Sequence, residues 1–190
     1  DIKLIIPKVK ESDVTGMVPT SSTTITLLLG DCIATTVMEQ RNFSKEKFKI
    51  FHPGGNIGSS LLLAKDIMVK DKKMPTINYK KKFKDALKIM NQKKLGVVVV
   101  LKNKFIKGLV TDGDLRRVLK DNSNYDNLDK LMTRNPLVVN ESMPASKALA
   151  IMNEKKVTSL LVVSDRDLNK NNKKLIGIIH IHFLLQNGIK

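Results

Sequence analysis

An internal repeat in the second half of the chain restricts the possible folds more than any other feature. Residues 86–94 recur as residues 148–156, identical at seven of nine positions and offset by 62. The flanking turn and apolar segments follow in the same order around both copies. A repeat of this length predicts two similar small domains that pack against each other.

Hydrophobic spacing within the two copies predicts their secondary structure. Apolar residues recur at helical spacing in each copy, at Phe83, Ala86, Leu87 and Met90 and again at Ala145, Ala148, Leu149 and Met152. The aliphatic runs 97–101 and 159–163 are typical of buried strands. Each copy is therefore predicted to be a βαββα unit. We expect these units at residues 61–122 and 123–190, joined by the polar segment 120–127.

The first sixty residues predict a different α/β segment. Residues 2–7 indicate a short buried strand that ends at proline, and the hydroxyl-rich run 19–24 is typical of a helix N-cap. Apolar spacing predicts a helix over residues 25–41, which with the strand suggests part of a parallel sheet. Because the chain begins at Asp1 and not at methionine, we expect it to be a fragment of a longer protein.

Charge and composition narrow the functional classes. Basic residues number 34 against 18 acidic ones, giving +16, which raises nucleic-acid binding as an alternative. Only five of the basic residues are arginines, and Trp, which could stack on bases, is absent. An A+T-rich coding sequence would yield the same excess of lysine without any nucleic-acid binding. The longest aliphatic run has five residues, so no membrane span is expected. The single cysteine, Cys32, fits a reducing cytoplasm.

Polar residues at the end of each copy are candidates for ligand binding. In the first copy, Thr111 and Asp114 could hold a nucleotide through its phosphate and ribose. The alternative is that Asp112 or Asp114 caps the last helix. In the second copy Phe183 replaces the acid. The two histidines there, His180 and His182, lack a third ligand, so no metal site is expected.

A loop histidine is a second candidate site. His52 precedes a proline and two glycines, where the backbone can approach a ligand closely, and imidazole exchanges protons near neutral pH. The alternative is that His52 only packs within its loop. The hydroxyls of the run 19–24 could likewise face a phosphate or sugar, in addition to capping their helix.

These motifs carry a resemblance that covers the whole chain. The two copies resemble a pair of CBS domains, and residues 1–60 resemble the C-terminal part of a sugar isomerase (SIS) domain. The order of Glu11, the hydroxyl run, Gly30-Asp31, the His52 loop and two CBS units resembles the bacterial D-arabinose 5-phosphate isomerases. This resemblance implies interconversion of D-ribulose 5-phosphate and D-arabinose 5-phosphate, which supplies the lipopolysaccharide sugar Kdo.

The resemblance also implies roles for particular residues. Glu11 would move a proton between carbons through an enediol, and His52 would protonate oxygen or open the sugar ring. Four hydroxyl residues would bind the sugar phosphate: Thr20, Ser21, Ser22 and Thr23. No metal or organic cofactor is required. The remaining active-site residues of the family lie upstream, so this chain alone is expected to be inactive.

Regulation and assembly follow from the same resemblance. The CBS pair implies a regulatory nucleotide, with Thr111 and Asp114 keeping the family pattern and Phe183 departing from it, so at most one competent site is expected. A homotetramer is also implied. The alternatives are a stand-alone nucleotide-sensing CBS module and a basic nucleic-acid-binding protein.

Overall fold

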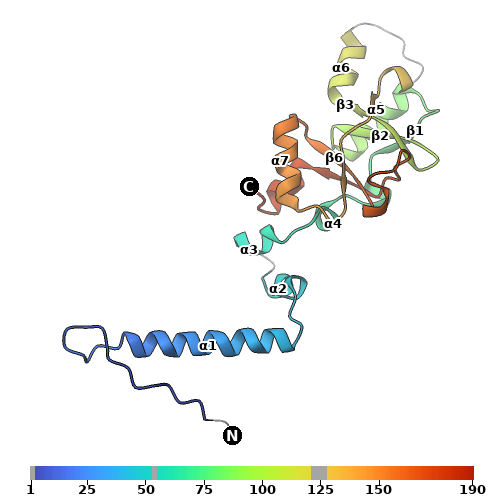
Figure 1. Cartoon of the computed structure of the whole chain (residues 1–190). Helices are drawn as coiled ribbons and strands as arrows, with labels where there is room; N and C mark the ends of the chain where they lie inside the picture. Colours follow the sequence, from blue (N-terminus) through green and yellow to red (C-terminus); the bar gives the residue numbers. More distant parts are fainter. Residues whose placement is uncertain (1–2, 53–54, 121–127) are drawn as a thin grey trace. The chain divides into compact units, whose positions relative to one another are not determined.

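The computed structural model describes residues 3–52, 55–120 and 128–190, which form two compact units, Asp1–Phe51 and His52–Lys190 (Figure 1). The first contains two helices, α1 (Ser21–Gln40) and α2 (Lys45–Phe51). The predicted strand at residues 2–7 is wrong for the described part of that segment, residues 3–7. A strand needs a neighbour for its backbone hydrogen bonds, and no strand occurs among the described residues of this unit.

Helix α1 exposes apolar side chains along its length. None of its twenty residues, all of which the structure describes, is buried. Leu27 and Leu28 are 68% and 61% exposed. The threonine hydroxyls of Thr24, Thr26 and Thr36 bond back to carbonyls one turn earlier, which satisfies these polar groups within the helix. By length and mean hydropathy, α1 is long and apolar enough to cross a membrane. No span was expected from the sequence, because the longest uninterrupted aliphatic run has five residues.

The second unit contains both copies of the repeat, each with the predicted βαββα order. A short helix α3 (Gly55–Ser60) lies ahead of them, at the end of a segment expected to be a loop. The first copy consists of β1 (Thr76–Asn78), α5 (Phe83–Lys93), β2 (Val97–Lys102), β3 (Phe105–Thr111) and α6 (Asp112–Lys120). The second consists of β5 (Val138–Asn140), α7 (Ala145–Lys155), β6 (Ser159–Val163), β7 (Gly177–His180) and α8 (Ile181–Gln186). The predicted linker lies outside the described residues, except for Lys120.

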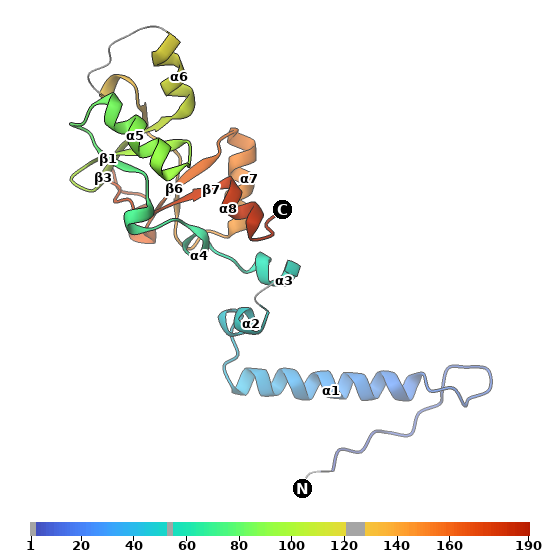
Figure 2. The same ribbon diagram turned by 180° about the vertical axis from the view of Figure 1, so that it is seen from behind.

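Each copy builds its own sheet with the same pairing. Strand β2 pairs parallel with β1 and antiparallel with β3, and β6 pairs in the same way with β5 and β7. Helices α7 and α8 lie beside their sheet in Figures 1 and 2. The predicted helix positions are confirmed as core, since Ala86, Met90, Ala148 and Met152 are buried. A third cluster, formed by Val99, Leu161, Leu175 and Ile178, joins the two copies.

The residues ahead of β1, 64–75, form the first lead-in, and the residues ahead of β5, 128–137, form the second. Each lead-in packs onto the other copy. Helix α4 (Ala64–Ile67) lies in the core of the second copy, and the Met68 side chain contacts Gly177 of β7. In return, β4 (Thr133–Arg134) pairs with β3 of the first copy, where Met132 contacts Gly108. Short 3-10 helices lie in these segments at Asp71–Lys73 and Leu128–Lys130, and a third, Asp165–Asp167, follows β6 within the second copy. The exchange brings residues 133–137 of the second lead-in beside the end of β3.

Candidate functional site

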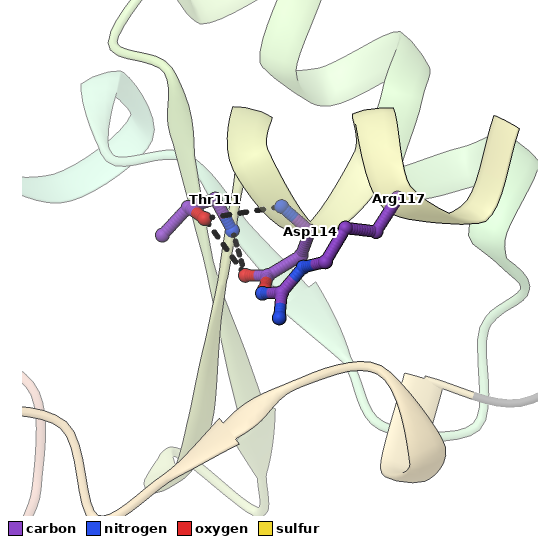
Figure 3. Close-up of polar contacts among 3 residues, drawn as sticks. All are labelled: Thr111, Asp114 and Arg117. Carbon is purple, nitrogen blue, oxygen red and sulfur yellow. Dashed lines mark hydrogen bonds and ion pairs between the residues drawn. The ribbon is translucent and has the colours of Figure 1, made fainter. Parts of the chain in front are cut away.

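The end of the first copy holds a buried polar network at the junction of β3 and α6. The Asp114 carboxylate accepts hydrogen bonds from the amide and the hydroxyl of Thr111, both at 2.8 Å (Figure 3). The Thr111 hydroxyl in turn accepts a 3.4 Å bond from the Asp114 amide. Arg117 from the next turn pairs with the other carboxylate oxygen. This reciprocal arrangement is a capping box, so the predicted capping role of Asp114 is present.

The same network fixes Thr111 at the edge of a cleft between the two copies. Thr111 is half-buried and lines a cavity of about 310 Å³, whereas Asp114 is only 3% exposed and holds Thr111 from behind. The walls come from three segments: the facing ends of β2 and β3 (Val97, Leu109, Thr111), the second lead-in (Thr133, Asn135, Pro136, Leu137), and the start of β6 (Lys156, Val157, Thr158, Ser159). Apolar side chains thus alternate with hydroxyl, amide and ammonium groups, so the cleft offers both kinds of contact to a small molecule.

The corresponding end of the second copy uses different side chains for the same cap. His180 is the N-cap of α8, and its Nδ1 accepts a 3.3 Å hydrogen bond from the His182 amide. Burial, and secondarily the charge of His182, lowers the pKa of His180 below 6.5. The neutral imidazole can therefore act as acceptor at neutral pH. Phe183, at the position of Asp114, packs on the second core and offers no acceptor.

A second cavity of about 770 Å³ lies at this end of the second unit. It is lined by residues 65–73 of the first lead-in together with Phe183. Within the described residues, no group of three His, Cys, Asp or Glu side chains gathers as a metal site would require. The two ends of the pair thus present a Thr111 cleft and a Phe183 cleft of different chemistry.

In the first unit, Glu11 anchors the start of α1. Its Oε2 accepts bonds from the Thr20 amide at 2.7 Å, the Thr20 hydroxyl at 2.9 Å and the Ser22 amide at 3.3 Å. The Ser22 side chain and then the Thr20 amide are the main causes that lower the pKa of Glu11 to about 2. Glu11 is thus ionised at neutral pH and satisfied by the helix N-terminus.

The hydroxyl residues predicted to bind substrate surround this anchor. Thr20, Ser21 and Thr23 line a hollow of about 570 Å³, with Ser12, Thr24 and Ile25 completing it. Ser22 faces Glu11 instead. The structure therefore brings Glu11 and the hydroxyl run together. His52 is exposed and begins the second unit, whereas Glu11 belongs to the first.

Several cleft residues escaped the sequence analysis. Ser159 could have been found, because the offset of 62 makes it the equivalent of Val97. The second copy therefore has a hydroxyl where the first has an apolar side chain at the start of a strand. Thr133 and Asn135 had no comparable signal. Their place in the cleft depends on the pairing of β4 with β3, which connects one copy to the other.

The comparisons with known proteins agree with this architecture. Residues 64–121 and 128–182 match the CBS domain. These matches cover more than half of the chain, which therefore belongs to the CBS domain family and contains a CBS pair. The expected α/β CBS-pair fold is confirmed.

Two curated relatives match the full length of the chain. Arabinose 5-phosphate isomerase KdsD of Yersinia pestis is 37% identical over 193 residues, and that of Escherichia coli strain K12 is 36% identical. Each alignment covers 100% of this chain and 57% of the relative. The chain therefore spans little more than half the length of these enzymes.

Solved CBS pairs share the fold of the second unit. The crystal structure of CBSX2 in complex with AMP matches 66% of this chain and 95% of its own, with 24% identity and a TM-score of 0.55. The CBS pair of protein MJ0100, in complex with 5′-methylthioadenosine and S-adenosyl-L-methionine, matches 68% and 98%, with 22% identity and a TM-score of 0.58. At these identities the comparisons establish the fold alone.

Proposed function

We propose that this chain is the C-terminal part of a cytoplasmic sugar-phosphate isomerase that interconverts D-arabinose 5-phosphate and D-ribulose 5-phosphate for Kdo synthesis. The observation that carries the proposal is the alignment with KdsD isomerases, which extends through residues 1–60 and is not confined to the CBS pair. A stand-alone CBS module or a nucleic-acid binder gives no reason for that N-terminal similarity. Residues 1–60 then belong to the isomerase domain, and 61–122 and 123–190 to the CBS domains.

In this proposal Glu11 is the proton-transfer base and His52 acts on the substrate oxygens. A carboxylate with a pKa of about 2 is a weak base, because Thr20 and Ser22 stabilise its charge. During the reaction, hydroxyl oxygens of the sugar phosphate would accept hydrogen bonds from Thr20 or Ser22 in place of Glu11. Glu11 would then lose part of the stabilisation of its charge, and its pKa would rise. Thr20, which donates to Glu11, also lines the hollow beside Ser21 and Thr23, so a sugar bound there can compete for this donor. The route needs no metal or organic cofactor.

The exposed apolar side chains of α1 support the same proposal. Leu27, Leu28 and Ile33 are 68%, 61% and 46% exposed, and an apolar helix of this kind is stabilised by packing rather than by water. We infer that the part of the isomerase domain present in the longer relatives, or another subunit of a homotetramer, covers these side chains. Alone, the chain is expected to be catalytically inactive.

The test is the turnover of a full-length isomerase that carries this chain. Glu11→Gln keeps an acceptor for Thr20 but removes the base, so we expect turnover to fall below detection while the fold is retained. Glu39→Gln, near the other end of α1 and outside the site, is the matched control and should leave turnover unchanged. Near-normal activity of Glu11→Gln would contradict the assignment.

A regulatory nucleotide is the second proposed function, carried by the Thr111 cleft. Thr111 is held by Asp114 and lies against apolar walls suited to a flat ring. Solved CBS pairs of the same fold bind AMP and S-adenosyl compounds, which makes adenosine nucleotides the first ligands to test. With Phe183 in place of an acid, the other end lacks this network. We therefore propose one nucleotide per chain.

A further inference from the structure

A buried hydroxyl without a partner lies in the wall of the Thr111 cleft. Ser159 begins β6 and is 6% exposed. Among the described residues, its Oγ is the one buried side-chain nitrogen or oxygen atom that lacks a hydrogen-bond partner. Buried polar groups are normally satisfied, because leaving one unpaired costs the free energy of its lost hydration. An orphaned hydroxyl in a cleft therefore points to a partner that binds there.

The fold itself does not require this hydroxyl. At the equivalent position of the first copy stands Val97, which also begins a buried strand and lines the same cleft. The backbone pairing is equivalent too, since Val97 lies opposite Thr111 and Ser159 opposite His180. An apolar side chain is thus compatible with this strand position. The hydroxyl at Ser159 needs an explanation other than packing.

We propose that Ser159 Oγ forms a hydrogen bond with the nucleoside part of a nucleotide bound in the Thr111 cleft. This inference rests on the proposed nucleotide function and adds a specificity residue from the second copy. Ser159 lines the cleft together with apolar residues such as Leu109 and Val157 and with the hydroxyl of Thr111, a mixture suited to a base or sugar edge. Lys156, which is exposed, is the cation available to a phosphate at the mouth. A hydroxyl can donate to a ring nitrogen or accept from an amino group.

Calorimetric titration of the whole chain with AMP and with adenosine tests the proposal. Ser159→Ala should weaken both ligands by roughly tenfold, the usual effect of one lost hydrogen bond. Because adenosine lacks the phosphate, an equal loss for both ligands places the contact on the nucleoside. Ser142→Ala is the matched control. Ser142 donates to Asp165 at 2.7 Å on the surface, and its loss should leave both affinities unchanged.

A second variant changes the hydrogen-bonding strength of the Ser159 side chain while nearly keeping its volume. Ser159→Cys keeps a similar volume with a weaker donor, so its affinity should fall between those of wild type and Ser159→Ala. Wild-type affinity in both variants would overturn the role of Ser159 while leaving the nucleotide cleft intact. A loss for AMP but not for adenosine would overturn the nucleoside contact. Absence of AMP binding by the wild-type chain would instead refute the nucleotide function, and this inference with it.

Discussion

The two CBS copies have the same order of elements but end in different chemistry. In the first, Thr111 caps α6 and Asp114 returns the bond, with Arg117 pairing the carboxylate. In the second, His180 caps α8 through Nδ1 and Phe183 packs on the core. Capping a helix is therefore a requirement that several side chains satisfy. A buried carboxylate that orients a hydroxyl toward a cleft is a more specific feature, and only the first copy has it among the described residues.

The contacts between lead-ins and strands give the largest expected difference between the copies. A Cβ at Gly108 would lie 2.6 Å from the sulfur of Met132 and 2.8 Å from the backbone oxygen of Thr133. The three atoms nearest to a Cβ at Gly177 all belong to the Met68 side chain, whose outer atoms can move aside although its own Cβ would lie 2.9 Å away. In urea unfolding, we expect Gly108→Ala to cost about 3 kcal/mol and Gly177→Ala about 1 kcal/mol.

A control for these substitutions is available on α6. Gly113→Ala adds a methyl group whose nearest neighbour, the Thr111 hydroxyl, is 3.6 Å away. It should leave stability unchanged or raise it by up to about 1 kcal/mol, because alanine favours a helix. Equal losses for Gly108→Ala and Gly177→Ala would show that the two lead-ins are held in the same way, contrary to the comparison.

The Asp114 network gives the next largest effect. Asp114→Ala leaves the Thr111 amide and Arg117 without their acceptor, so unfolding free energy should fall by about 2 kcal/mol. AMP affinity should fall by more than tenfold, because the Thr111 hydroxyl loses its orientation. Asp112→Ala, at an exposed neighbouring acid, is the control and should do neither. If Asp114→Ala loses stability but keeps wild-type affinity, Asp114 is a helix cap only.

The smallest effect is the pH dependence of the second cap. The pKa of His180 is lower in the folded protein than its ordinary value of 6.5, so the unfolded chain binds more protons as pH falls below that value. Stability should therefore decrease as pH drops through 6.5 toward the folded pKa. Asn also accepts at an N-cap but does not titrate. His180→Asn should flatten the pH dependence of the unfolding temperature, and an unchanged slope would assign that dependence to other groups.

The sequence predicted those features that depend on local patterns. Seven identities at an offset of 62 and the Met90 and Met152 helix positions were sufficient for two βαββα units, because hydrophobic spacing reports directly on local structure. The strand at residues 2–7 was wrong, since a strand depends on a partner that the pattern does not contain. The exchanged lead-ins could not be predicted either, because contacts between copies leave no periodic signal.

The candidate sites divide in the same way. Thr111 and Asp114 were found from their place after a strand, although spacing could not tell a cap from a ligand site, and the structure shows that one network serves the cap and also positions Thr111 in the cleft. Ser159 was missed because a lone serine in an apolar strand has no meaning until its surroundings are known. The low pKa of Glu11 likewise depends on contacts made by the folded helix start.

We propose that the two copies are unequal and that only the Thr111 end binds a nucleotide. Calorimetric titration of the chain with AMP measures this directly as the number of ligands bound per chain. We predict one AMP per chain, with binding weakened by Asp114→Ala and unaffected by Phe183→Ala. Two equivalent sites per chain, or no binding at all, would contradict the claim.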